Sequence, residues 1–393
     1  MRITTAILKK VEHVLVNLLA LPMGNRERRR RFRHRILDFH LSDFMAFHRF
    51  ARCAVDPDSV LLVEPGNCHG EVIAGYVSYF RELGFPVDIL VSREVNEESP
   101  FCRLDKKGCR VFGVNSAGMG LLLQSDKILR YRHVVLMTSA YYWEGPDGKP
   151  ASMTFLGKFP NLKRHPSLFV VEHDLSDVAR FGEEGLLSQN RLIVLGRFGK
   201  GVFLSPIRFG KCRKSPKNKT TTFITVGVVK AFRKNHEALI RAIERLAAEK
   251  LKFKVVVVGS GTLGNLSAAA RAHVKMMGRQ DFPEMFNCLE RADFFLPLLD
   301  ADNPDHERYI TTGVTGSAQL VYAFSKVPVL HPKFAAFYGF TDDNAVLSAD
   351  LTDGMRRAIV LSAHDYAARQ KDLTELARKL ERETTDNLRT ILK

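Results

Sequence analysis

The chain has 393 residues, of which 45% are hydrophobic and 26% are charged, an ordinary globular composition. This excludes a disordered, collagen-like or disulfide-scaffold chain, and the length predicts two or three domains. Lys and Arg number 59 against 43 Asp and Glu, so the formal net charge is +16. Most of that excess lies in residues 1–55 and 208–219, which excludes a uniformly basic surface.

Residues 1–55 combine an amphipathic pattern with an arginine cluster. Apolar residues recur at spacings of three and four from Ile7 to Leu19, and RERRRRFRHR follows at residues 26–35. Charged residues interrupt the apolar stretch, so it does not predict a membrane-spanning helix. An amphipathic helix beside a polybasic patch predicts that residues 1–35 bind an anionic membrane surface. The alternative is a helix packed on the core with a solvated arginine face.

Two further classes of partner are not expected. The arginine cluster contains a single aromatic residue, Phe32, whereas a nucleic-acid stacking platform would interleave several. The six cysteines form no Cys-x-x-Cys pair and no zinc-like spacing with histidine, so we expect no metal site. Scattered thiols without a cleavable signal indicate a cytoplasmic protein, which the basic arm would hold on the inner face of the cell membrane.

The first half of the chain after this arm alternates between strand and helix patterns. A buried strand is predicted at 59–64, a helix at 71–83 and a second strand at 86–91, which together form a βαβ unit. Further strands are predicted at 133–137, 168–171 and 192–195.

A second alternation begins after residue 220. Strands are predicted at 222–226, 253–258, 292–296 and 327–330, and helices at 235–250, 283–291, 315–324 and within 365–393.

These patterns predict an α/β protein with two Rossmann-like, doubly wound domains that face each other across a cleft. The domains would span 56–205 and 221–365, joined by a linker at 206–220 that contains Pro and Gly and the second basic cluster. A tail helix at 366–393 would follow. Ligands of such sheets bind outside the carboxyl ends of the strands, so the strand-end loops are the candidate sites.

The most specific segment runs from Thr225 to Gly261. A strand ends at Gly227, the basic loop VVKAFRKN follows, and a helix and a second strand lead to GSG. This resembles the start of the C-terminal domain of GT-B glycosyltransferases, in particular the family-four-like group (glycosyl transferases group 1) of bacterial surface-polysaccharide type. The resemblance implies that Lys234 binds the donor diphosphate. Val228 stands where the family usually has arginine, so Lys230 or Arg233 would have to replace it, unless the loop is merely solvated.

The resemblance covers most of residues 58–393 and is specific for 222–330, with one departure. It also implies that the tail helix at 366–393 crosses back to the first domain. It implies that Arg279, at a strand end, contacts the nucleobase and that Glu307 holds a ribose hydroxyl. The family's paired glutamates are absent. The Thr, Gly and Ser residues in their place suit a phosphate at a helix N-terminus, although ordinary N-capping is the alternative. The residues expected to hold the phosphate are Thr312, Gly313, Thr315, Gly316 and Ser317.

In the first domain, two strand-end segments carry candidate catalytic residues. EPGNCHGE contains His69 and Glu71 beside the start of a helix, and FVVEHDL places His173 at the end of a strand. An imidazole or carboxylate there could position the acceptor hydroxyl, contact the transferred sugar or act as a base. Each histidine could equally be a packed or surface residue.

Taken together, the resemblance implies a membrane-peripheral GT-B glycosyltransferase that needs no cofactor and no metal. Its donor would be a UDP- or GDP-linked sugar, and its acceptor a cell-surface glycan or a lipid-linked oligosaccharide. Two alternatives remain: a nucleotide-sugar epimerase of the same architecture, and a non-catalytic sugar-nucleotide-binding protein.

Overall fold

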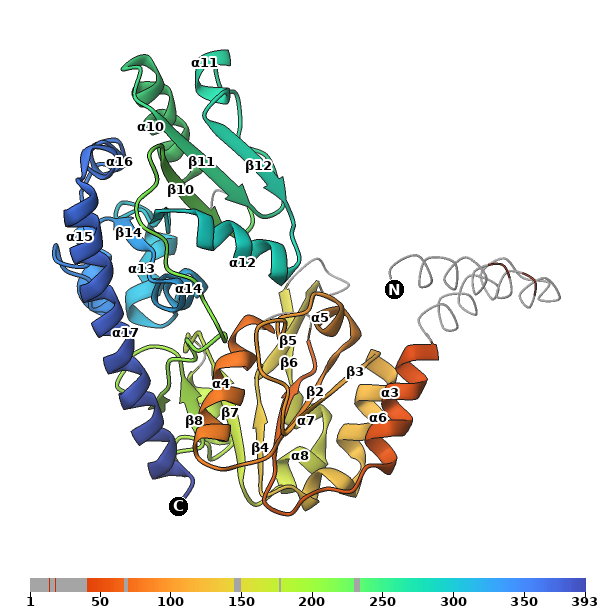
Figure 1. Cartoon of the computed structure of the whole chain (residues 1–393). Helices are drawn as coiled ribbons and strands as arrows, with labels where there is room; N and C mark the ends of the chain where they lie inside the picture. The colour runs from red at the N-terminus through yellow and green to blue at the C-terminus, as the bar shows by residue number, and fades with distance from the viewer. Residues whose placement is uncertain are drawn as a thin grey trace.

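The computed structural model describes Val14, Leu18 and residues 41–66, 70–144, 150–176, 178–229 and 234–393 (Figure 1). The predicted helix at 7–19 therefore lies outside the described residues, except for Val14 and Leu18. Both of these are helical, and their side chains are exposed. No helix in the described ranges is long and apolar enough to cross a membrane.

The N-terminal domain is built on a seven-stranded sheet in which all neighbouring strands are parallel. Its strands are β1 Val60–Glu64, β2 Val87–Ser92, β3 Cys109–Val114, β4 His133–Leu136, β7 Leu168–Glu172, β8 Leu192–Val194 and β9 Val202–Phe203. They lie in the order β3-β2-β1-β4-β7-β8-β9, so the chain direction across the sheet reverses between β1 and β4.

Helices cover both faces of this sheet, as a parallel sheet with apolar strands requires. Buried residues of β1 face two separate clusters, one containing Leu61 and Val63 and the other Val60 and Leu62. The helical segments are α3 Leu41–Arg52, α4 Gly70–Glu82, α5 Arg93–Glu97, α6 Ser116–Gln124, η1 Asp126–Arg130, α7 Phe155–Lys158, α8 Pro160–Arg164 and α9 Val178–Glu183. An antiparallel hairpin, β5 Ala140–Glu144 with β6 Pro150–Thr154, is inserted after β4.

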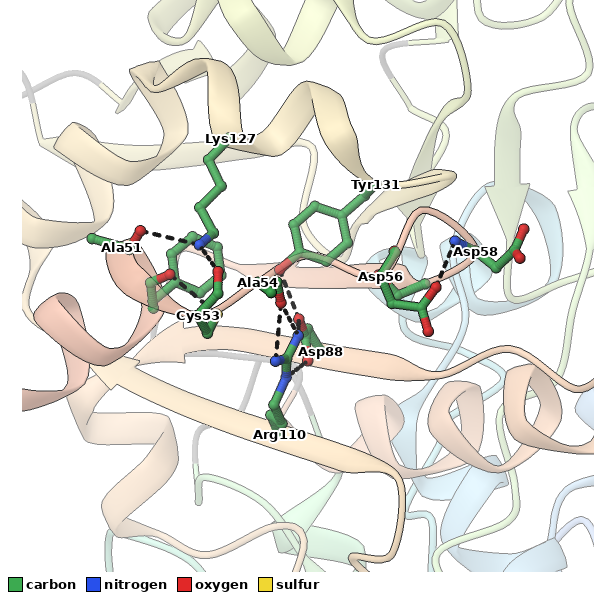
Figure 2. A network of polar contacts seen from close by, with 11 residues as sticks. Ala51, Cys53, Ala54, Asp56, Asp58, Asp88, Arg110, Lys127 and Tyr131 are labelled. Atoms are coloured by element: carbon green, nitrogen blue, oxygen red, sulfur yellow. Dashed lines mark hydrogen bonds and ion pairs between the residues drawn. The ribbon is translucent and has the colours of Figure 1, made fainter.

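A polar network fixes the segment that follows α3 to the rest of the domain (Figure 2). The guanidinium of Arg110 donates to both carboxylate oxygens of Asp88, at 2.7 and 2.6 Å, and to the carbonyl of Ala54. Tyr131 donates its hydroxyl to the same carboxylate, and the ammonium of Lys127 reaches the carbonyl at Ala51. The end of the N-terminal arm is thus tied to β2 and β3, strands that lie toward one edge of the sheet.

The C-terminal domain repeats this architecture with a six-stranded parallel sheet. Its strands are β10 Thr221–Val226, β11 Phe253–Val258, β12 Val274–Gly278, β13 Phe294–Phe295, β14 Val327–Leu330 and β15 Val346–Leu347, in the order β12-β11-β10-β13-β14-β15. Its helices are α10 His236–Ala248, α11 Ala268–Arg271, α12 Phe282–Arg291, α13 Pro304–Thr311, α14 Gly316–Phe324, α15 Pro332–Tyr338 and α16 Leu351–Val360.

The basic linker at 206–220 contacts both domains, although four of its basic residues, Lys211, Arg213, Lys214 and Lys219, are exposed. Arg208 pairs with Glu82 of the N-terminal domain, whereas Lys217 donates to the carbonyls of Ile359 and Leu361, at 2.8 and 2.7 Å. The backbone approach is close as well: a Cβ on Gly75 of α4 would lie 2.5 Å from the carbonyl carbon of Pro206. Glycine at this position therefore lets the linker pass against the helix.

The last element, α17 Ala363–Ile391, is a single helix that runs along one side of both domains (Figure 1). Leu373 and Leu380 are buried in a cluster of the C-terminal domain, while Leu388 is buried in the N-terminal core. Thr384 accepts a hydrogen bond from the backbone N–H of Ser205 at 2.9 Å. The two domains are thus joined by the linker and by this helix.

Candidate functional site

A cavity of about 420 Å³ lies between the two domains, next to the carboxyl ends of both sheets. In each sheet the chain direction reverses beside it, between β1 and β4 and between β10 and β13, and open α/β sheets bind their ligands at such points. The polar side chains on the cavity wall are Glu71, Glu98, His173, Lys234, Gln280, Arg308, Tyr309, Thr315, Ser317 and Gln319.

The N-terminal domain forms one wall of the cavity, called the N-terminal wall below. Behind it, two buried carboxyl groups lie at strand ends, and they differ in charge. Desolvation raises the pKa of Glu64, at the end of β1, to about 8, although Thr138 and the N–H of Gly66 donate to it. Burial also opposes ionisation of Glu172, at the end of β7. There, hydrogen bonds from His173 and Ser139 outweigh the burial and lower its pKa. At neutral pH, therefore, Glu64 is mostly neutral and Glu172 is an anion.

His173 lies where the N-terminal wall meets the other domain. Its Nδ1 is 3.2 Å from Oε1 of Glu172, and its side chain is 39% exposed toward the cavity. Its carbonyl accepts a hydrogen bond from the N–H of Val314 in the C-terminal domain at 2.9 Å. Next to it, Asp174 forms an ion pair with Arg308 at 2.7 Å. The histidine is thus held by contacts from both domains.

Glu71 occupies the first turn of α4 and faces the start of α14. Its Oε1 lies 3.9 Å from where a Cβ on Gly316 would stand. Desolvation raises the pKa of Glu71, an effect that the nearby His173 counteracts and the nearby Glu98 reinforces. A half-buried carboxyl group with a raised pKa beside an imidazole can exchange a proton or accept a hydrogen bond from a hydroxyl.

The C-terminal wall contributes a buried lysine. Lys234 precedes α10, is 7% exposed, and donates from Nζ to Oγ1 of Thr225 at 3.1 Å. Its aliphatic stem crosses Gly227, where a Cβ would lie 3.2 Å from Cε of the lysine and where φ is +127°. Burial lowers the pKa of Lys234 to about 7. Among the residues that the structure describes, no carboxylate lies within ion-pair distance of this ammonium group.

The start of α14 forms the wall next to Glu71. Thr315 caps the helix by accepting the N–H of Ser317 at 3.3 Å, so the predicted N-cap is present. Gly316 and Ser317 both line the cavity, and the first-turn N–H groups carry the positive end of the helix dipole. One turn further, Gln319 is 2% exposed, and its Oε1 has no hydrogen-bond partner in the described part of the chain.

Part of this site, including Lys234, lies in a segment that matches a family model. Residues 220–302, which include β10, Lys234 and α12, match the family model for Glycosyl transferases group 1. Over these residues the chain is similar to the group 1 glycosyltransferases. The sequence matches no curated protein.

Solved structures show a likeness in fold over most of the chain. TarM matches with a TM-score of 0.53 at 11% identity, over 86% of this chain and 100% of that chain. A mutant of S. aureus TarM in complex with Fondaparinux, alpha-GlcNAc-glycerol and UDP gives the same TM-score and identity, over 85% and 100%. WaaG, a glycosyltransferase involved in lipopolysaccharide biosynthesis, matches with 0.46 at 12% identity, over 83% and 98%. The likeness to TarM confirms the expected GT-B fold.

The cavity brings together several of the predicted residues. Glu71, His173, Lys234, Thr315, Gly316 and Ser317 all line it. Their roles stay predictions. His69, Lys230 and Arg233 lie outside the described residues.

Four other predicted residues are not on the cavity wall. Arg279 is largely exposed and pairs with Glu98, while Glu307 forms an ion pair with Lys333 at 2.5 Å. The backbone at 312–313 pairs instead with the other domain: Thr312 accepts the N–H of Leu175 at 2.6 Å, and Gly313 bridges to Asp174. The segment 312–314 thus joins the domains, and the helix N-terminus beyond it faces the cavity.

The sequence did not predict the residues that reach the cavity only through tertiary packing. Glu98 follows α5, and Arg308 and Tyr309 lie on α13, a helix for which no periodic pattern was identified. Glu172 could have been predicted as a site residue, because it directly precedes His173 at a predicted strand end. In the described ranges, no group of three or more His, Cys, Asp or Glu side chains is arranged to hold a metal ion.

Proposed function

We propose that the chain transfers a sugar from a nucleoside diphosphate sugar to a hydroxyl group of a cell-surface glycan or a lipid-linked oligosaccharide. The observation that carries this proposal is Lys234. A buried ammonium group without a carboxylate partner in the described structure stands beside a cavity into which a capped helix also points. Cations and helix N-termini are the groups that neutralise a diphosphate leaving group.

In the proposed reaction, the two walls of the cavity bind different substrates. Lys234 and the start of α14 would hold the diphosphate, with Lys230 or Arg233 adding charge from the neighbouring loop. The acceptor would be contacted from the N-terminal domain by Glu71, His173 and His69. The UDP named in the complex of the S. aureus TarM mutant supports a nucleotide donor for a chain of this fold. Positive charge comes from the protein itself in this scheme, so we expect turnover to survive EDTA.

Calorimetry with UDP and GDP, followed by incubation with a panel of nucleotide sugars, tests the proposal. We expect one nucleotide to bind and its sugar conjugate to release nucleotide when a hydroxyl acceptor is present. An epimerase would convert the donor sugar without net release of nucleotide, and a binding protein would bind without turnover. If neither nucleotide binds and no donor is consumed, the proposal is wrong.

The N-terminal arm indicates where in the cell the chain would bind its acceptor. We propose that residues 1–35 attach the enzyme to the anionic inner face of the cell membrane. Val14 and Leu18, one helical turn apart, have exposed fractions of 59% and 55%, and the cluster at 26–35 follows in sequence. Each basic residue near an anionic surface contributes about 1 kcal/mol.

Vesicle flotation tests the arm. We expect the full chain to float with phosphatidylglycerol vesicles and to stay behind with phosphatidylcholine alone. A variant with Arg28, Arg29, Arg30 and Arg31 changed to Gln should lose most of this binding, whereas the same number of changes at exposed residues of α17 should not. Equal flotation of wild type with both vesicles, or no effect of the changes, would contradict the membrane role.

A further inference from the structure

Glu172 is positioned by an unusually complete set of hydrogen bonds for a side chain at a strand end. Its Oε1 accepts the N–H of His173 at 2.8 Å and that of Asp174 at 3.1 Å, and it lies 3.2 Å from Nδ1 of His173. Its Oε2 accepts the hydroxyl of Ser139, a residue 5% exposed. The carboxylate itself is 6% exposed, so it is both desolvated and fixed in direction.

This arrangement bears on which imidazole nitrogen of His173 carries the proton. A carboxylate next to Nδ1 favours a proton on that atom, because it then accepts a charge-assisted hydrogen bond. The other ring nitrogen, Nε2, is then the one with the lone pair. The backbone of His173 is also fixed, through the 2.9 Å bond from Val314 to its carbonyl. Glu172 therefore contacts Nδ1 of His173, while the other domain holds the backbone of this residue.

We propose that Glu172, supported by Ser139, is a positioning residue that holds His173 as the Nδ1–H tautomer, so that Nε2 accepts a hydrogen bond from the hydroxyl of the acceptor. This rests on the proposed glycosyl transfer and specifies how its acceptor side works. The ligand recognised at Nε2 is a neutral hydroxyl group. Glu172 and Ser139 are not among the residues assigned to the diphosphate, so acceptor positioning and donor binding are separable.

A purely structural role for Glu172 is the competing explanation, since its carboxylate also caps two backbone N–H groups. The change Glu172→Gln separates the two roles. The amide oxygen can still accept from the N–H groups of residues 173 and 174, and the amide nitrogen can donate to Ser139. The charge that favours a proton on Nδ1 is lost, however. Glu183→Gln, on an exposed glutamate of the same domain, is the matched control.

The tautomer is measured directly by NMR on the full chain labelled with ¹⁵N in its histidine rings, with the signal assigned by its loss in His173→Gln. In the wild type we expect Nδ1 protonated and Nε2 unprotonated at neutral pH. In Glu172→Gln we expect the protonated-Nε2 form to gain substantially, and no change in Glu183→Gln. A wild-type ring protonated on Nε2, or a tautomer ratio indifferent to Glu172→Gln, would overturn the proposal.

Kinetics then tests the consequence, with the donor found by the nucleotide-sugar panel and with water and octyl glycosides as the hydroxyl acceptors. We expect Glu172→Gln to lower kcat roughly 10- to 1000-fold, by analogy with other residues that orient a functional histidine. Ser139→Ala should lower kcat less. The Kd for the nucleotide should stay within about twofold.

The outcomes keep the two proposals apart. If wild type neither binds a nucleotide nor consumes a donor, the proposed function fails. If wild type is active and Glu172→Gln has unchanged kcat, only the positioning role is wrong. If Glu172→Gln loses nucleotide binding together with kcat, the residue is structural, and the positioning role is again excluded.

Discussion

Replacing Lys234 with methionine should weaken nucleotide binding while stabilising the free protein. Burial lowers the pKa of this lysine from 10.5 to about 7, so at pH 8 about nine in ten free molecules carry a neutral amine. A diphosphate beside Nζ would restore the charged form. Binding should then take up about 0.9 proton at pH 8 and only about 0.1 at pH 6.

The pH dependence of affinity follows from the same linkage. The bound state has the higher pKa, so affinity is greatest below about pH 7 and falls as the free amine forms. Between pH 7 and 9 we expect a decline approaching tenfold per pH unit. A hydrogen bond to a charged group contributes about 1.5–3 kcal/mol, so Lys234→Met should bind roughly 10- to 150-fold more weakly at pH 7 and show little pH dependence above it.

The stability effect has the opposite sign. Between pH 7 and 10.5 the unfolded chain keeps a proton on Lys234 that the folded chain releases, so wild-type stability rises with pH across this window. Keeping the buried amine protonated at lower pH costs on the order of several kcal/mol. Lys234→Met should therefore raise the melting temperature at pH 7 by several degrees, and by less at pH 10.

Isothermal titration calorimetry with UDP and GDP in two buffers of different ionisation enthalpy measures the proton uptake, and calorimetric melting measures stability. Lys254→Met, an exposed lysine of β11, is the control that should change neither. Nucleotide binding without proton uptake at pH 8, together with unchanged affinity in Lys234→Met, would refute the assignment of the diphosphate to this lysine.

Two further substitutions test the structure around the site. Gly75→Ala should destabilise the chain by about 1–3 kcal/mol in urea unfolding, because the added Cβ meets the backbone of Pro206; Gly120→Ala, whose nearest neighbour is 3.8 Å away, should be neutral or stabilising. Loss of stability in both variants alike would contradict the close-approach argument. Glu64→Gln should increase stability by a few kcal/mol at pH 9 and change it little at pH 4, because the raised pKa, about 8, means that wild type loses stability as pH rises from about 4.5 to 8. A larger gain at pH 4 than at pH 9 would show that Glu64 is not the buried neutral acid described above.

The strands of both domains could be predicted where their sequences are continuous apolar runs. The predicted strands 59–64 and 253–258 match β1 and β11 to within one residue, because β1 is buried along its whole length and β11 is a mostly buried apolar run in which only Lys254 is exposed. β3 was not predicted, because Arg110 and Gly113 interrupt its apolar pattern. Its half-buried pattern reflects its place at the edge of the sheet.

The candidate site was predictable to the extent that each residue lies at the end of its own strand or at the start of a helix. Lys234, His173 and Thr315 were found in this way. Glu98 and Arg308 reach the cavity only because the two domains are packed together, and no local pattern encodes that packing. The same packing explains why Arg279 pairs with Glu98 instead of standing alone at the strand end.

The short bridge between residues 173–175 and 312–314 makes the backbone that carries the imidazole of His173 part of the joint between the domains. Any rotation that widens the cleft on this side has to break the bonds from Val314 to His173 and from Leu175 to Thr312, and with them the register between the imidazole and the start of α14. Under the proposed function, an opened molecule would exchange nucleotide while His173 is separated from the start of α14. If His173 positions the acceptor as proposed, water that enters the open cleft would not be oriented by it, so hydrolysis of the donor would be slow in that state.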